Sequence, residues 1–256
     1  MSSEALIKYY TSLMFNAWPS EDYFFLNGWI LRLSNEKCRR SSSLIANEYY
    51  GESVENDLSL VEQIFEKYGH YPRFIIHDHV KPSNLVPVLI SHGYNRSSDY
   101  LVVMSCKKAD FCFSQQLTDE TVKYYQTNDL DPTWFSFIND HEPEEIRLTK
   151  ETANRIITPE KQFFYAVDQN SVVGSLFSVL DPMGNMFVGH LFVAENYRRK
   201  KIALALMDKA IIWGCSRPDL RLKNVWFQVY STNKEAISFY TKIGFSEEYS
   251  YSYLQK

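Results

Sequence analysis

The sequence predicts an α/β (α+β) protein built on a mixed, mostly antiparallel sheet flanked by helices. Three β-rich runs, at 163–168, 171–180 and 185–194, are joined by short segments with turn chemistry, which is typical of an antiparallel meander. Helical and strand patterns then alternate to the end of the chain. Aromatic residues make up 16% of the chain, which favours sheet-rich packing because aromatic side chains prefer strands.

Composition excludes several classes of protein. A net charge of -4 argues against nucleic-acid binding, which usually needs a broad basic face. No run approaches the roughly 18 apolar residues of a membrane span, and the N-terminus lacks the apolar core of a signal peptide. The cysteines show no C-x-x-C spacing, so we expect free thiols, no metal site and a reducing cytoplasmic location; they are Cys38, Cys106, Cys112 and Cys215.

The second half of the chain gives the clearest pattern. Beyond the three strands, apolar spacing predicts a helix over 198–214, and capping residues predict another over 233–244. Strands are expected at 224–230 and 245–254. Three helical segments are expected ahead of the meander, at 118–127, 132–140 and 143–155. After these helical segments the expected order is β-β-β-α-β-α-β.

The first half shows fewer sheet elements. Its tail repeats the order helix, strand, helix and strand found in the second half, which can indicate a duplicated fold. Polar residues near 107–116 suggest a boundary between domains at 1–107 and 108–256. Strands are expected at 28–34, 40–49, 73–78 and 100–105, and helices at 55–69 and 84–93.

The basic run Arg198-Arg199-Lys200-Lys201 stands at the start of a predicted helix. Cations normally favour the other end, because first-turn N–H groups already carry partial positive charge. A polyanion such as a pyrophosphate would explain the run, since backbone N–H groups and cationic side chains would both bind it. The alternative interpretation is a solvated basic cluster.

Two motifs here resemble those of the GCN5-related N-acetyltransferases, the GNAT family. Residues 198–203, preceded by Val193 and Tyr197, are similar to the cofactor motif Q/R-x-x-G-x-G/A. Residues 233–245 are similar to N-x-x-A-x-x-F-Y-x-K-x-G-F. The resemblance covers roughly 110–256 and implies the GNAT fold, with acetyl-CoA (coenzyme A) as co-substrate. Lys201 replaces the usual glycine, and its Cβ could narrow the approach of backbone to phosphate.

The resemblance also implies roles for individual residues. Tyr240 would protonate the leaving thiolate; its alternative role is a core aromatic. A splayed strand at 190–193 would offer backbone groups to the cofactor, with the Val193 N–H as oxyanion donor. Asn233 would contact the cofactor or act only as an N-cap. The full cofactor-binding set is Leu191, Phe192, Val193, Arg198, Arg199, Lys200, Lys201, Ile202, Ala203, Asn233 and Tyr240.

The general base is less defined. His190 lies on the same predicted strand and has a suitable pKa range, although a lone histidine is often only a core or surface residue. Tyr230 and Ser231 could instead hold a water, and an amine that is already deprotonated would need no base. Tyr240 and His190 are therefore the catalytic candidates.

The first half reads as a degenerate GNAT-like domain. Counting back from Gly93 places Leu89 and Pro82 where the second half has Tyr240 and Asn233. The corresponding helix start carries Glu52, Glu55 and Asp57, and carboxylates would repel a pyrophosphate. This half would complete a shared sheet, shape the acceptor cleft or form the face of a homodimer. The pair at 39–40, Arg39-Arg40, is either an anion site or a solvated pair.

Two functions follow from these observations. The first is an N-acetyltransferase that moves the acetyl group of acetyl-CoA directly to a primary amine of a small molecule or peptide. The second is a weakly active or inactive CoA-binding sensor or scaffold, suggested by Lys201 and by the undefined base. Neither involves a nucleic acid or a membrane.

Overall fold

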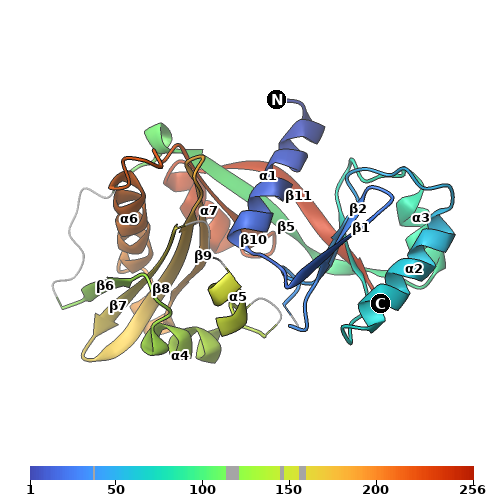
Figure 1. The fold of residues 1–256 in the computed structure, drawn as a ribbon. Helices are drawn as coiled ribbons and strands as arrows, with labels where there is room; N and C mark the ends of the chain where they lie inside the picture. Colours follow the sequence, from blue (N-terminus) through green and yellow to red (C-terminus); the bar gives the residue numbers. More distant parts are fainter. Residues whose placement is uncertain (37, 114–120, 145–146, 156–159) are drawn as a thin grey trace.

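The computed structural model describes residues 1–256 except 37, 114–120, 145–146 and 156–159. In this part of the chain, eleven strands form one sheet with the order β1-β2-β3-β4-β11-β5-β10-β9-β8-β7-β6 (Figure 1). The strands are β1 (Asp22–Leu26), β2 (Trp29–Leu33), β3 (Ser43–Ile45), β4 (Arg73–Ile76), β5 (Asn95–Lys107), β6 (Lys123–Thr127), β7 (Glu160–Asp168), β8 (Ser171–Leu180), β9 (Asn185–Val193), β10 (Asn224–Tyr230) and β11 (Ser246–Gln255).

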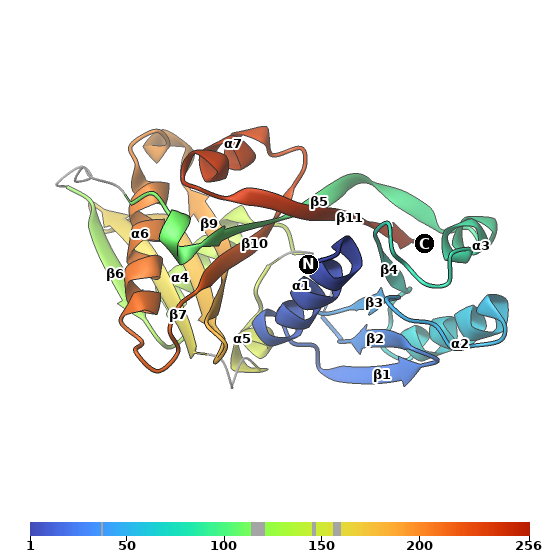
Figure 2. The same cartoon turned by 90° about the horizontal axis from the view of Figure 1, so that it is seen from above.

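Helices cover both faces of this sheet. They are α1 (Ser3–Ala17), α2 (Val54–Glu66), α3 (Leu85–Ser91), α4 (Pro132–His141), α5 (Lys150–Arg155), α6 (Ile202–Cys215) and α7 (Lys234–Lys242). One core cluster packs α6 and α7 on the second half of the sheet, and another packs α1 and α4 on its opposite face. A third core lies under α2 and α3. Figure 2 shows α1 lying between the α4–α5 side and the β1–β3 side of the molecule.

The two halves of the chain repeat one topology and exchange their last strands. Strands β3 and β4 are parallel and joined through α2, as β9 and β10 are parallel and joined through α6. β5, the last strand of the first half, pairs with β10, whereas β11 pairs with β4. The exchanged strands also pair with each other. The expectation of a shared sheet is confirmed, while the division at residue 107 stays a prediction.

Several expected elements have different limits in the structure. The helix expected at 118–127 is wrong in its described part, because 123–127 form β6; residues 118–120 lie outside the described residues. Tyr125 stacks on Tyr165 of the neighbouring strand at 5.3 Å between ring centroids. Tyrosine side chains favour strands, and in this segment that preference outweighed the polar pattern that predicts a helix.

The other differences concern element limits. α6 begins at Ile202, not near Arg199. The strand expected at 40–49 is reduced to β3, and in the described part of 143–155 only α5 is helical. α1 and β1 were not predicted. Among the described residues, no helix is long and apolar enough to cross a membrane.

Candidate active site

An opening between two parallel strands forms the centre of the candidate site. β9 pairs with β10 only where 185–187 lie beside 224–226. Beyond this point β10 continues beside β5, and β9 continues beside β8 to Val193. The second halves of the two strands are therefore not hydrogen-bonded to each other, and the expected splay at 190–193 is confirmed.

The end of β9 turns its backbone polar groups toward this opening. The β8–β9 register shifts between the pairs Phe177↔Gly189 and Ser175↔Phe192. The N–H of Ala194 donates to the carbonyl of Val173 on β8 at 2.9 Å. Because backbone groups alternate along an antiparallel strand, the N–H and C=O of Val193 face the open side. Arg198 Nε donates to that Val193 carbonyl at 3.3 Å.

The basic run forms the loop that leads into α6. Arg199 and Lys201 both have left-handed backbones, with φ of 65° and 62°, and Lys201 is the N-cap. The first intrahelical bond runs from the Ala205 N–H to the Lys201 carbonyl at 3.0 Å. The N–H groups at 202–204 consequently have no acceptor within the helix. The left-handed conformation also gives a backbone reason for the glycine that related motifs place at this position.

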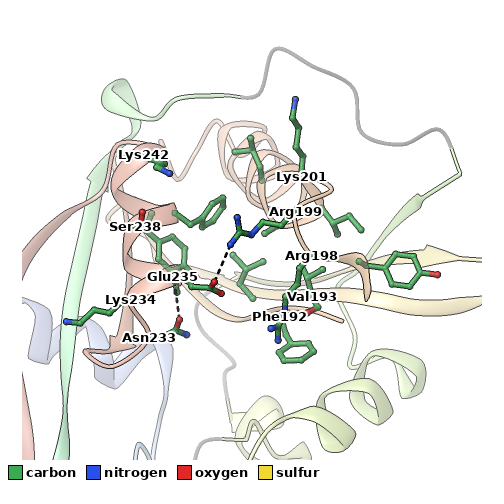
Figure 3. A pocket seen from close by; sticks show the side chains of 18 residues that line it. Phe192, Val193, Arg198, Arg199, Lys201, Asn233, Lys234, Glu235, Ser238 and Lys242 are labelled. Carbon is green, nitrogen blue, oxygen red and sulfur yellow. Dashed lines mark hydrogen bonds and ion pairs between the residues drawn. The ribbon is translucent and has the colours of Figure 1, made fainter. Parts of the chain in front are cut away.

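A cavity of about 710 Å³ lies between this loop, β9 and α7 (Figure 3). It gathers every predicted cofactor-binding residue except Lys200, whose Nζ lies over the Tyr197 ring at 4.8 Å. Its lining is cationic, with Glu235 as the single carboxylate among the lining residues. Figure 3 shows Arg199 and Glu235 reaching toward each other at 3.3 Å, both largely exposed. The lining residues are Leu191, Phe192, Val193, Tyr197, Arg198, Arg199, Lys201, Ile202, Ala203, Leu204, Asn233, Lys234, Glu235, Ala236, Ser238, Phe239, Tyr240 and Lys242.

Tyr240 both packs in the core and lines the cavity. Its ring packs on Phe227 with 3.9 Å between centroids, as a core aromatic would, yet the residue also lines the cavity. Burial raises the pKa of the Tyr240 phenol well above its ordinary value. No hydrogen-bond partner for its hydroxyl occurs in the described part of the chain. The group is thus a protonated donor at neutral pH.

Asn233 is also both a cap and a lining residue. Its side-chain oxygen accepts the Ala236 N–H at 3.1 Å, which satisfies one donor at the start of α7. It lies at the edge of the same cavity (Figure 3). The structure therefore establishes the cap, and cofactor contact stays a prediction.

His190 lies on β9 but does not line the cavity. Its side chain is buried between the rings of Trp18 and Trp134, at 5.6 and 5.8 Å between centroids. Nδ1 bonds to the carboxylate of Glu142. Nε2 is buried without a hydrogen-bond partner among the described residues. Glu142 was not predicted, because 48 residues separate it from His190 and no sequence pattern joins them.

Comparison with known proteins assigns part of the chain to a family. Residues 123–245 match the model of the acetyltransferase (GNAT) family. The "Uncharacterized N-acetyltransferase YobR" of Bacillus subtilis is 23% identical over 234 residues, covering 90% of each chain. A GCN5-related N-acetyltransferase from Kribbella flavida superposes with a TM-score of 0.70 at 12% identity, covering 100% of this chain and 95% of the other.

A tandem GNAT protein from the clavulanic acid biosynthesis pathway has the same fold over 84% of this chain and 74% of its own, with a TM-score of 0.62 and 9% identity. Motifs, fold and comparisons agree that residues 123–245 form a domain of the GNAT acetyltransferase family.

Proposed function

We propose that this protein transfers the acetyl group of acetyl-CoA to a primary amine of a small molecule or peptide. The observation that supports this most strongly is the single cavity that joins the basic loop, the open edge of β9 and Tyr240. These are the three parts that direct acyl transfer needs: an anion site, an oxyanion donor and a proton donor.

The residues present fit the pyrophosphate of acetyl-CoA. The N–H groups at 202–204 have no acceptor within α6, and Arg198, Arg199 and Lys201 add positive charge beside them. A helix start with free N–H groups and nearby cations is a general binding site for phosphate. In Figure 3 the Lys201 side chain extends away from Arg199 and Glu235, so it does not fill the space between loop and α7.

The chemistry follows from the groups that face the opening. Acetyl-CoA supplies the acyl group as a thioester. In this proposal the Val193 N–H donates to the carbonyl oxygen as negative charge develops on it. Tyr240 holds the proton that a leaving thiolate requires. His190 remains the candidate general base, since Glu142 occupies Nδ1 and leaves Nε2 to accept a proton.

The alternative function is CoA binding without turnover. It is favoured by one observation, the absence of His190 from the cavity lining. Calorimetric titration with acetyl-CoA, followed by an assay of free CoA release with a panel of amines, separates the two. Binding with transfer supports the enzyme, and binding without transfer supports the sensor. If acetyl-CoA did not bind, both functions would be wrong.

We also propose that residues 1–107 are a GNAT-like half without a CoA site of this kind. Leu89, at the position equivalent to Tyr240, is fully buried in its own core. Asp57, at the acidic start of α2, forms hydrogen bonds within the fold, because its carboxylate accepts from Asn27 at 3.0 Å and from Tyr49 at 2.8 Å. Acetyl-CoA should therefore bind with a stoichiometry of one.

A further inference from the structure

A buried arginine lies on the α1 face of the sheet, away from the proposed CoA cavity. Arg32 of β2 is 0% exposed, and its guanidinium donates to the carbonyl oxygen of Trp18. The Tyr23 hydroxyl also interacts with it. Its Nε and Nη1 have no hydrogen-bond partner, and no carboxylate pairs with it, among the described residues. A buried cation without a counter-charge is costly unless something else satisfies it.

Ser43, the neighbour of Arg32 in the sheet, also has a buried hydroxyl without a hydrogen-bond partner in the described part of the chain. Ser43 is the cross-strand neighbour of Arg32 in the β2–β3 pair, so both side chains lie on one face of the sheet. Most buried polar groups in native proteins are hydrogen-bonded. Neighbouring buried polar atoms without hydrogen-bond partners therefore indicate that a bound molecule supplies the partner. Besides those of Arg32, the buried polar side-chain atoms without a partner in the described chain include Trp18 Nε1, Ser20 Oγ, Ser42 Oγ and Ser43 Oγ.

The region also connects to the surface and to His190. Arg40 is only partly buried, and both Arg40 and Arg32 act electrostatically on Tyr253, so the cationic region extends from Arg32 toward solvent. The Arg40 guanidinium lies over the Trp18 ring, 5.1 Å from its centroid. The same ring is 5.6 Å from the imidazole of His190. One indole therefore contacts both the arginine region and the candidate base.

We infer that Arg32, with Ser43 beside it and Arg40 nearby, binds the carboxylate of a compact amine acceptor whose amine is directed toward His190. This rests on the proposed acetyltransferase function and narrows its acceptor to amino-acid-like molecules. A guanidinium presents N–H donors in a planar fork that matches a carboxylate, and hydroxyls supply further donors. The deep burial of Arg32 favours a small acceptor over a folded protein or long peptide.

Matched pairs of acceptors provide the test. Each amine is offered as the free acid and as the carboxamide: glycine and glycinamide, β-alanine and β-alaninamide, L-phenylalanine and L-phenylalaninamide. The carboxamides have less basic amines, so their intrinsic reactivity at neutral pH is higher. A preference for the free acid must therefore come from the protein. We expect at least one pair in which kcat/KM for the acid exceeds that for the amide roughly tenfold to hundredfold.

Two variants locate the source of that preference. Arg32→Met should reduce the acid-to-amide ratio of kcat/KM to near one, mainly by raising KM for the acid. Its affinity for acetyl-CoA should equal that of the wild type, because Arg32 does not line the proposed CoA cavity. Arg32→Lys retains the charge and should restore part of the ratio. Arg96→Met is the matched control on β5, where Arg96 bonds to Ser252, and should leave the ratio unchanged.

Two results would overturn the inference: amides accepted as well as acids in every pair, or an acid-to-amide ratio in Arg32→Met equal to that of the wild type, whether or not both rates fall. Calorimetric binding of the free acids and amides without CoA is measured in parallel. If acetyl-CoA fails to bind but the acids bind through Arg32, the proposed function is wrong and the carboxylate site stands. If acetyl-CoA binds but the free acids neither bind nor react, the proposed carboxylate site is wrong.

Discussion

The imidazole of His190 on β9 bonds through Nδ1 to the carboxylate of Glu142, which directly follows α4. The pair lies on the face of the sheet opposite α6, and the His190 side chain is 1% exposed. Burial alone would raise the pKa of Glu142, but the charge of His190, its hydrogen bond and the more distant Arg40 and Arg147 bring it below its ordinary value. The contact fixes the imidazole and leaves Nε2 as its remaining proton acceptor.

This contact predicts a pH-dependent stability. Because the pKa of Glu142 is lower in the folded than in the unfolded state, its contribution is present above the unfolded value of about 4.3 and is lost as pH falls through the folded value. Glu142→Gln should lower the free energy of unfolding near neutral pH by roughly 1–3 kcal/mol. In urea unfolding at several pH values, the gap between wild type and variant should narrow below about pH 4. A gap that stays constant across this range would contradict the assignment.

The exposed carboxylate of Glu235 provides the control for that measurement. It pairs with Arg199 in the lining of the proposed CoA cavity, where both side chains are mostly solvated. Exposed ion pairs contribute little, so Glu235→Gln should change the unfolding free energy by less than about 0.5 kcal/mol at any pH.

Replacement of Tyr240 by phenylalanine tests the proton donor. The ring packing on Phe227 is retained, so the fold and the acetyl-CoA affinity should be unchanged. The rate constant kcat should fall about a hundredfold, within the usual range for loss of a general acid. Tyr197→Phe is the control, since Tyr197 also lines the cavity but donates its hydroxyl to Asp168 at 2.9 Å. Equal kcat values in wild type and Tyr240→Phe would remove Tyr240 from the mechanism.

Charge reversal at two neighbouring positions tests the phosphate site. Arg198→Glu should raise the Kd for acetyl-CoA roughly a hundredfold, because it replaces an attractive charge in the cavity lining with a repulsive one. Lys200→Glu makes the same change of charge outside the lining and should raise Kd by less than about fivefold. Calorimetry measures both. Similar losses in the two variants would mean that only net charge matters and that the loop has no specific phosphate site.

The left-handed backbone at Lys201 predicts an unusual effect of glycine. Lys201→Gly should raise the unfolding free energy by about 0.5–1 kcal/mol, because a side chain at φ 62° costs more than the added freedom of glycine in the unfolded chain. Lys201→Val should lower it by about 1–2 kcal/mol, because branching at Cβ opposes this conformation. Lys200→Gly, at a residue without positive φ, should be destabilising. Urea denaturation that ranks the two glycine variants equally would contradict this account.

Contiguous features of the chain were predictable. Both motif segments carry their chemistry within about a dozen residues, so the loop before α6, the Asn233 cap and Tyr240 on α7 were identified and lie around one cavity. Predictions from local sequence patterns were wrong where the pairing of strands or the backbone conformation determined the secondary structure. The segment at 123–127 became a strand because β7 lies beside it, and α6 began later than expected because Arg199 and Lys201 adopt left-handed backbones.

The amino-acid sequence by itself determined the family resemblance, the candidate anion-binding loop and the candidate proton donor, because each depends on neighbours in the chain. The tertiary structure alone decided the exchange of β5 and β11, the contact of His190 with Glu142 and the burial of Arg32 without a counter-charge. These features join residues that lie far apart in the sequence. Their contacts depend on how strands pair and which face each side chain occupies, and a single sequence does not encode that information in any local pattern.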